Sequence, residues 1–301
     1  MRLDRILTLG LGRPWRAVFP SDGPRVPVLM YHSISDDPEL SFSPYYKVCT
    51  YPQRFAEQMQ WLADGGYRGV TLTEGLAALR REESHKDQVT GKKNHSNHGN
   101  NPIGENQKLV AITFDDGFRD FHTAAFPVLR QHGFSATMYL PTAFIGDERK
   151  NFKTRKCLTW AEVQELQDAG MEFGSHTVTH PKLVELDWPQ IEIELNESKK
   201  TIEQKLQRPA RSFAYPYAFP QANRDFASRF ESVLREAGYE SCATTEIGPM
   251  RVSDDPLRTK RYPANSCDDE SLLRAKLAGA YDWIRQPQRL IKRFKSVRSR
   301  W

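Results

Sequence analysis

Short apolar runs alternate along this sequence with longer segments of helical spacing, and this alternation limits the folds that the chain can adopt. The apolar runs read as strands, and the segments between them carry apolar residues on one helical face. Repeated strand–helix units favour a parallel sheet covered by helices, either a closed barrel or a doubly wound sheet. Because about seven such units follow one another, we predict an α/β fold of the distorted (β/α) barrel type.

The predicted elements lie between residues 25 and 263. We predict strands at Arg25–Ile34, Tyr67–Leu72, Leu109–Asp115, Ser135–Leu140, Met171–Ser175, Ser212–Tyr217, Glu240–Thr244 and Arg258–Pro263. We predict helices at Pro52–Ala63, Thr73 (as the cap) to Arg81, Phe121–Gln131, Thr159–Ala169, Pro189–Leu206 and Arg224–Ala237. In such a barrel we expect the functional residues where strands end, at the carboxyl edge of the sheet.

Three segments differ in composition from the barrel, which we assign to residues 25–265. Residues 1–24 form an N-terminal extension, and residues 266–301 form a helical basic tail. Residues 83–108 contain no Phe, Tyr or Trp and are rich in Asn, Gly, Lys and His, so we predict a mobile surface insertion in preference to a metal site. The insertion nevertheless holds three potential metal ligands: His85, His95 and His98.

The net positive charge of the chain comes from its last residues. The formal charge is +5, but the last 17 residues hold 7 basic residues and no acidic one, which leaves −2 for the rest. A barrel without net positive charge argues against nucleic acid as a partner. The tail also carries an apolar stripe at helical spacing: Leu290, Phe294, Val297 and Trp301. The stripe either packs on the domain or places residues 285–301 on an anionic membrane surface.

Neither the N-terminus nor the cysteines indicate secretion. No apolar run approaches the roughly 20 residues of a membrane-spanning helix. The stretch Ile6–Gly12 barely reaches the length of a signal-peptide core and is closely followed by arginines, so we predict no cleavable signal. The four cysteines have no short regular spacing, which predicts neither a disulfide framework nor a zinc finger. We expect a cytoplasmic protein, with the tail as a potential contact to the inner membrane surface.

Potential catalytic side chains follow two of the predicted strands. Asp115 and Asp116 come directly after an apolar strand, and His176 and His180 follow another. Two imidazoles and a carboxylate form a three-ligand metal site that leaves positions open for water and substrate. Since the two aspartates are adjacent, their side chains diverge. One can therefore bind the metal while the other takes a proton from the water.

Three motifs in this order resemble the polysaccharide deacetylase family, the NodB-homology carbohydrate esterases. They are TFDDG at 113–117, SHTVTH at 175–180 and FAYPY at 213–217, and the similarity extends over residues 26–265. The resemblance implies a distorted barrel of βα units. It also implies metal-dependent hydrolysis of an N- or O-acetyl group on a sugar.

The resemblance assigns a role to each motif residue. It implies that Asp115 is the general base and that Asp116, His176 and His180 bind the divalent metal. The metal is zinc (Zn²⁺) in most members and Ni²⁺, Co²⁺ or Fe²⁺ in others. Tyr217 matches the tyrosine whose backbone N–H helps to stabilise the tetrahedral oxyanion.

The chain departs from the family pattern at two positions. Where the family commonly has an arginine that contacts the catalytic aspartate, this chain has Ala214. Arg261 is a candidate substitute, and the alternative is an ordinary surface arginine. The family's general acid is a histidine on a late strand, but no histidine follows His180. His32 ends an early Tyr-His strand, and this pattern resembles a subgroup of the family in which the last motif stands at the front of the chain. The resemblance implies that His32 protonates the leaving amine; the alternative is a structural histidine.

The leading hypothesis is a metal-dependent hydrolase that removes acetyl groups from N-acetylated sugars of a polysaccharide or of a glycan or lipid-linked precursor. One alternative is a catalytically inactive carbohydrate-binding or scaffold protein on the same fold. Another is a glycoside hydrolase, although adjacent carboxylates are poorly placed to act across a sugar bond. His122 and His132 lie on a helix away from the strand ends, so we predict that both are non-catalytic.

Overall fold

A computed structural model describes residues 3–12, 23–37, 47–90 and 108–289. At its centre is a curled sheet in which β12, β11, β10, β7, β6, β2 and β14 are neighbours in that order, while β5 pairs with β6. All pairings within this sheet are parallel. Its strands are β2 (Val28–Tyr31), β5 (Tyr67–Val70), β6 (Lys108–Phe114), β7 (Thr137–Leu140), β10 (Glu172–Ser175), β11 (Ser212–Ala214), β12 (Ser241–Ala243) and β14 (Tyr262–Pro263).

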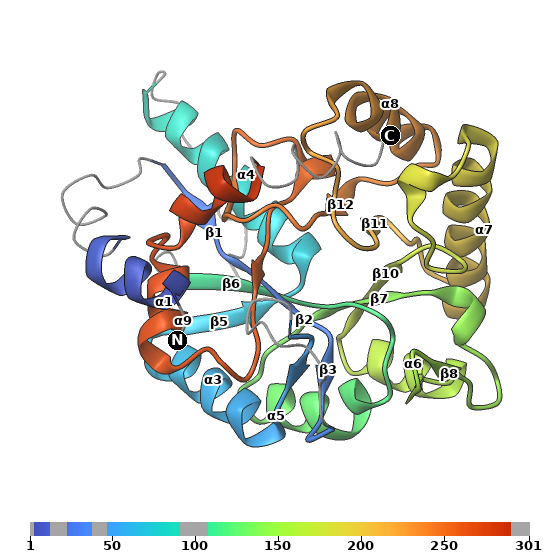
Figure 1. The fold of residues 1–301 in the computed structure, drawn as a ribbon, viewed down its shortest axis with the longest axis horizontal. Coiled ribbons are helices and arrows are strands. Elements are labelled where there is room, and N and C mark those ends of the chain that lie inside the picture. The colour runs from blue at the N-terminus through green and yellow to red at the C-terminus, as the bar shows by residue number, and fades with distance from the viewer. Residues whose placement is uncertain (1–2, 13–22, 38–46, 91–107, 290–301) are drawn as a thin grey trace.

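One short segment brings the two ends of the sheet together. Thr259 forms a parallel bridge with Ala243 of β12, and Tyr262 of β14 pairs with Leu29 of β2. Residues 259–263 therefore join β12 to β2, and the sheet curls into a distorted barrel (Figure 1). The predicted fold class is confirmed.

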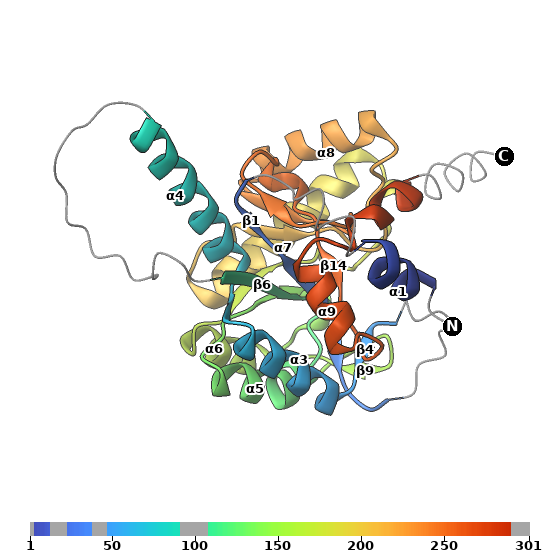
Figure 2. The ribbon, with the colours of Figure 1, turned by 90° about the vertical axis from the view of Figure 1, so that its left-hand side faces the viewer.

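Helices surround the sheet. Figure 1 shows α3, α5, α6, α7 and α8 around its outer side, and Figure 2 shows α4 extending away from it. The α-helices are α1 (Leu3–Leu7), α3 (Pro52–Asp64), α4 (Leu72–Thr90), α5 (Phe126–Gln131), α6 (Trp160–Asp168), α7 (Trp188–Leu206), α8 (Arg224–Glu236) and α9 (Glu270–Leu277). Among the described helices, none has the length and apolar character of a membrane span.

Shorter elements complete the fold. The π-helical segments are η1 (Thr8–Gly12) and η3 (Phe121–Ala125), and the 3₁₀ turns are η4 (Thr142–Phe144), η5 (Leu183–Glu185), η6 (Pro256–Arg258) and η7 (Asp282–Ile284). Three further strand pairs lie outside the main sheet: β1 (Arg25–Val26) with β13 (Met250–Arg251), β3 (Ser33–Ile34) with β4 (Cys49–Thr50), and β8 (Asn151–Phe152) with β9 (Arg155–Lys156). The β8–β9 pair is antiparallel.

Burial and capping explain why these residues form a barrel. The last five residues of β6 are all buried, as expected for a parallel strand that is covered on both faces. Helices α6 and α7 each begin with a capping box, formed by Thr159 with Glu162 and by Asp187 with Gln190. These caps fix where each helix begins after its strand.

The predicted cap of the helix after β5 is wrong. Helix α4 begins at Leu72, and Thr71 rather than Thr73 accepts the N–H of Glu74, at 3.1 Å. The Thr73 hydroxyl instead donates to Glu172 on β10 at 2.6 Å. Both threonines suit a cap, and the contact with a distant strand decides between them.

Two predicted boundaries also move. Helix α4 continues to Thr90 rather than ending near Arg81, since no Pro or Gly follows Arg81 until after the helix ends. The single strand predicted at Arg25–Ile34 is divided into β1, β2 and β3. One break is at Pro27, which has no N–H to donate to a sheet, and the other is at His32. The other predicted strands and helices match observed elements within a few residues at either end.

Several predictions fall outside the described ranges. Residues 91–107 make up most of the predicted insertion 83–108, and residues 290–301 contain the apolar stripe of the tail. His95, His98 and the membrane contact through residues 285–301 therefore stay predictions, and so do the domain boundaries. The predicted insertion is wrong for residues 83–90, which continue helix α4 and include His85. Within the described part of the predicted tail, α9 and η7 are helical.

Candidate active site

The carboxyl ends of β6 and β10 bring one carboxylate and two imidazoles together. One ligand atom from each of Asp116, His176 and His180 lies within 4.8 Å of the others. Nε2 of His176 is 3.6 Å and Nε2 of His180 is 3.2 Å from Asp116 Oδ1. All three side chains are buried. The three residues that the sequence predicts as metal ligands thus converge on one point, and we refer to them as the triad.

The backbone at these strand ends adopts an uncommon conformation. Asp116, Thr177, His180 and Tyr217 have positive φ values of 75°, 69°, 57° and 57°. Residues other than glycine rarely enter this left-handed region, and those that do cluster at functional sites, where the surrounding structure holds them. The strain is therefore concentrated where the predicted site residues lie.

Helix α7 holds the turn that carries the two histidines. Glu194 Oε2 accepts the N–H groups of Val178 and Thr179 at 2.7 and 2.9 Å, and its Oε1 accepts the Thr179 hydroxyl at 2.6 Å. The hydroxyls of Ser175 and Ser198 also lie 2.6 Å apart. Sequence reasoning missed Glu194, because no motif connects a residue inside the next helix to the histidine turn.

The contacts of the triad fit a divalent cation. Asp116 Oδ1 is buried and has no hydrogen-bond partner among the described residues, which is costly for a carboxylate oxygen unless a ligand pairs with it. Nδ1 of His176 is hydrogen bonded to the Ala214 carbonyl at 2.8 Å, which leaves Nε2 facing Asp116. Metal-binding histidines usually have such a second contact. Two imidazole nitrogens and a carboxylate oxygen are donors that Zn²⁺ and related divalent ions accept.

The charge states of the triad also suit a cation. Burial would raise the pKa of Asp116, but His180, His32 and Lys153 more than offset this and hold the pKa well below its usual range. Burial lowers the pKa of His176 to about 4, so its imidazole is neutral near pH 7. An ionised carboxylate beside a neutral imidazole is the state in which these groups bind metals.

Asp115 lies next to the triad in sequence but pairs with a different residue, Arg261. The guanidinium donates to both carboxylate oxygens, with Nη1–Oδ1 at 2.7 Å and Nη2–Oδ2 at 2.8 Å. Its Nε donates to the Thr244 carbonyl at 3.0 Å. Burial would raise the pKa of Asp115, but the charge of Arg261 lowers it. Arg261 is only 1% exposed, so the alternative of a surface arginine is wrong.

His32 stands between β2 and β3 and also lies near Asp115. Its Nε2 is 4.0 Å from Asp115 Oδ2, and its side chain is 20% exposed. Burial lowers the pKa of His32, although Asp115 and Asp116 oppose this shift. The early Tyr-His motif therefore ends beside Asp115, the neighbour in sequence of the aspartate that faces the two histidines.

Aromatic rings line the outer side of the triad. The Tyr217 ring is 4.7 Å from the His180 ring between centroids, and Tyr217 is 48% exposed. The Phe152 ring on β8 is 5.1 Å from the His180 ring. An exposed ring beside a buried polar cluster offers a substrate an apolar contact surface.

The β8–β9 hairpin adds a charged residue that sequence reasoning missed, Lys153. Its Nζ lies 3.1 Å from Asp116 Oδ2, and its side chain is 43% exposed. The hairpin turn consists of Lys153 and Thr154, which lack the glycine or asparagine that marks such turns in a sequence. No pattern in the sequence therefore indicated either the hairpin or its contact with the triad.

The remaining predicted residues lie elsewhere. Nε2 of His122 is 3.1 Å from Glu165 on α6, and the His132 ring lies 5.5 Å from that of Phe134. Neither histidine belongs to the triad. Their predicted lack of a catalytic role agrees with this placement and stays a prediction.

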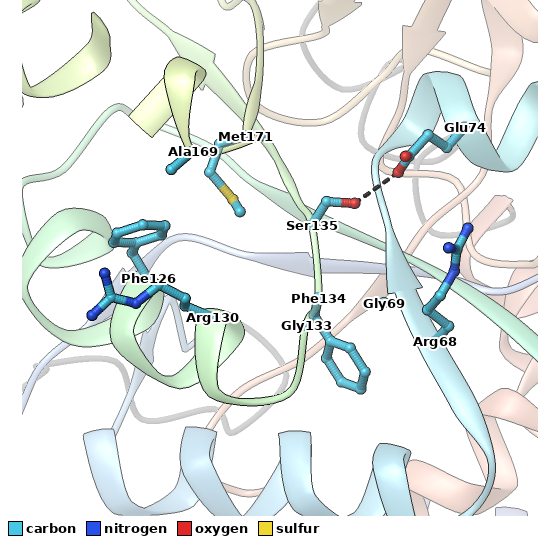
Figure 3. A pocket seen from close by; sticks show the side chains of 11 residues that line it. Arg68, Gly69, Glu74, Phe126, Arg130, Gly133, Phe134, Ser135, Ala169 and Met171 are labelled. Atoms are coloured by element: carbon cyan, nitrogen blue, oxygen red, sulfur yellow. Dashed lines mark hydrogen bonds between the residues drawn. The ribbon is translucent and has the colours of Figure 1, made fainter. Parts of the chain in front are cut away.

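A surface pocket, shown in Figure 3, lies at the amino-terminal ends of β7 and β10. The two histidines of the triad follow the other end of β10. Residues that precede or begin β7 and β10 line the pocket, including Ser135 and Met171, together with Arg68 and Glu74. Glu74 accepts the Ser135 hydroxyl at 2.7 Å, as Figure 3 shows. The pocket contains none of the residues predicted for the site.

Comparison with known proteins agrees with the three motifs. Residues 103–242 match the family model described as polysaccharide deacetylase. The protein YxkH of Bacillus subtilis is 29% identical over 224 residues, which cover 74% of this chain and 66% of YxkH. The poly-beta-1,6-N-acetyl-D-glucosamine N-deacetylase of Staphylococcus aureus is 25% identical over 173 residues, 54% of this chain and 52% of that protein. The chain thus spans between half and two thirds of the length of these curated relatives.

A solved structure supports the fold. The Streptococcus pyogenes deacetylase PplD, determined in complex with acetate, superimposes with a TM-score of 0.66 at 23% identity. The match covers 85% of this chain and 99% of that chain. At this identity the likeness bears on the barrel and leaves the activity of this chain to be argued from its own residues.

Proposed function

We propose that this chain is a metal-dependent hydrolase of the polysaccharide deacetylase type that removes acetyl groups from N-acetylated sugars. The substrate would be a polysaccharide or a glycan precursor, and the N-deacetylase among the relatives supports this class. The observation that carries the proposal is the convergence of Asp116, His176 and His180, with the ionised Asp115 beside them.

The triad would hold the cation. Asp116, His176 and His180 leave coordination positions open, and a bound divalent ion, Zn²⁺ by the donor set, would polarise the acyl carbonyl and lower the pKa of water. The left-handed turns at Asp116 and His180 orient the donors before any ligand arrives. This preorganisation means that little rearrangement is needed on binding.

Asp115 is the proposed general base. Arg261 contacts both of its oxygens, which fixes the carboxylate and keeps it ionised. Asp115 takes a proton from the water that attacks the acyl carbon. Arg261 acts through Asp115 and is therefore a positioning residue, in the place of the arginine that position 214 lacks.

His32 and Tyr217 complete the proposed reaction. As the carbon–nitrogen bond breaks, the sugar nitrogen needs a proton to leave as an amine. His32 lies 4.0 Å from Asp115 and would pass to that nitrogen the proton that Asp115 takes from the water. The backbone N–H of Tyr217 is the proposed donor to the negatively charged acyl oxygen. The products are acetate and the free amino sugar.

The test is acetate release from N-acetylglucosamine oligosaccharides of several linkages, by chelator-treated protein with and without added Zn²⁺, Co²⁺, Ni²⁺ or Fe²⁺. We expect release that depends on the metal and that the His180→Ala variant lacks. Release of reducing sugar in place of acetate would instead support a glycoside hydrolase. Bound metal without any release would favour the carbohydrate-binding alternative, and no bound metal would overturn the site.

A further inference from the structure

The β8–β9 hairpin places a positive charge of the protein itself against a ligand of the triad. Lys153 Nζ is 3.1 Å from Asp116 Oδ2, the second oxygen of the carboxylate whose Oδ1 faces both histidines. The ammonium also lies over the rings of Phe152 and Tyr217, 4.6 and 5.6 Å from their centroids. Lys153 therefore has three favourable contacts that hold its ammonium group beside Asp116.

The backbone conformation of the hairpin turn determines where this lysine lies. Lys153 and Thr154 have φ values of 48° and 68°, both left-handed. Two successive positive φ values form the tight turn that matches the twist of an antiparallel strand pair. Since neither residue is glycine, the turn stores strain, and its contacts with the rest of the protein must hold it in place.

Arg155, directly after the turn, supplies these contacts. Its Nη1 donates to the hydroxyls of Ser33 and Ser35, both at 2.7 Å, and to Asp37 at 2.8 Å. Its Nη2 lies 2.8 Å from Cys49 Sγ, and Figure 2 shows β9 beside β4. The hairpin is thus fixed to the strand pair that follows His32. Lys153 is held near Asp116 by this framework as well as by its own ion pair.

A lysine in this position opposes the binding of a divalent cation. Without the cation, the ammonium is the partner of Asp116, a carboxylate that is only 2% exposed. With the cation present, two positive charges approach the same carboxylate, or the lysine swings into solvent and loses its ion pair. Both outcomes favour the metal-free protein relative to the loaded one.

We propose that Lys153 lowers the affinity of the triad for divalent cations and takes the place of the cation as the charge partner of Asp116 when the site is empty. This inference rests on the metal site of the proposed function. It adds to that function a lysine that competes with the metal for the Asp116 carboxylate and so lowers the affinity for the metal. The loss of the ion pair and the repulsion act in the same direction, so the sign of the effect does not depend on where the lysine moves.

The test compares the Zn²⁺ affinity of four chelator-treated proteins by competition with a chromophoric chelator: the wild type, Lys153→Met, Lys153→Arg and Lys156→Met. Lys156 lies on the same hairpin, is exposed, and forms no ion pair among the described residues, so its variant is the matched charge control. We expect Lys153→Met to bind Zn²⁺ at least about tenfold more tightly than the wild type. Lys153→Arg and Lys156→Met should retain the affinity of the wild type.

A thermal melt of each metal-free protein provides the second measurement. Lys153→Met should melt at a lower temperature without metal, because Asp116 loses its partner, and should gain more from saturating Zn²⁺ than the wild type gains. If the wild type binds Zn²⁺ and Lys153→Met binds it equally or more weakly, the proposed role of the lysine is wrong and the metal site stands. Failure of every protein to bind any metal would overturn the metal site and this inference together.

Discussion

The two ends of strand β10 carry similar polar side chains in opposite circumstances. At its amino-terminal end, Glu172 accepts the hydroxyls of Thr73 and Thr137 at 2.6 and 2.8 Å. Nearby, Glu74 accepts the Ser135 hydroxyl, at the pocket of Figure 3. The carboxylates at this end are hydrogen bonded to neighbouring residues and fix the beginnings of strands and helices.

At the carboxyl-terminal end, a carboxylate oxygen is left without a hydrogen bond from any described residue. Asp116 Oδ1 is buried between two imidazoles and has no hydrogen-bond partner in the part of the chain that the structure describes. The strained backbone positions at Asp116, Thr177 and His180 also lie here. A surface pocket alone therefore does not identify the site of the chemistry. Buried polar atoms that await a ligand locate it better.

Removing a carboxylate from each end should have very different effects. Asp116→Ala should abolish both metal binding and acetate release, because the triad loses its only anionic donor. Glu172→Gln, which removes the carboxylate charge at the other end, should leave both unchanged. Metal content by mass spectrometry and acetate release would be measured on the same preparations. Retention of metal by Asp116→Ala would show that the triad is not the site.

Asp115→Asn separates the chemistry from the metal. The variant keeps the shape of the side chain and leaves the triad intact, so the metal content should equal that of the wild type. Without a carboxylate to accept the proton, kcat for acetate release should fall by about 10²- to 10⁴-fold. A loss of metal in parallel with the loss of rate would indicate that Asp115 is a ligand and would contradict the division of roles between the two aspartates.

Arg261→Met tests the buried ion pair behind the base. The variant leaves the Asp115 carboxylate, whose side chain is 4% exposed, without its charge partner. Breaking a buried pair from one side costs about 3–5 kcal/mol, so the free energy of unfolding in urea should fall by that amount. Arg261→Lys keeps the charge but loses the two-pronged contact, and should cost less. An unchanged unfolding free energy for Arg261→Met would mean that the pair does not stabilise the fold.

The sequence allowed the triad to be predicted because its residues stand at the ends of apolar strands, where local pattern and position in the barrel agree. Arg261 could be recognised only as a candidate. Its burial follows from the pairing of β14 with β2, which places it beside β6, and no local pattern records such pairings. Lys153 and Glu194 had no signal at all, since one lies in a turn without turn residues and the other inside a helix.

The same limit explains the error at the start of α4. Thr71 and Thr73 have equal intrinsic preference for a helix cap, and the contact between Thr73 and Glu172 decides which one serves. Sequence reasoning therefore predicted the elements and the carboxyl-end motifs. It failed where a residue's role depends on a partner far along the chain.

The smallest expected effect concerns the Thr71 cap, on the side of the pocket. Thr71 Oγ1 accepts the N–H of Glu74 at 3.1 Å, and Glu74 Oε2 accepts the N–H of Thr71 at 2.8 Å. Thr71→Ala removes one of these two bonds and should lower the free energy of unfolding by about 1 kcal/mol, while Thr71→Ser, which keeps the hydroxyl, should lower it less. Neither variant should change kcat/KM for acetate release, because this end of the sheet stabilises the fold and does not touch the reacting groups. If Thr71→Ala slowed acetate release well beyond its effect on stability, the two ends would be coupled, and the separation of structure from chemistry along β10 would be wrong.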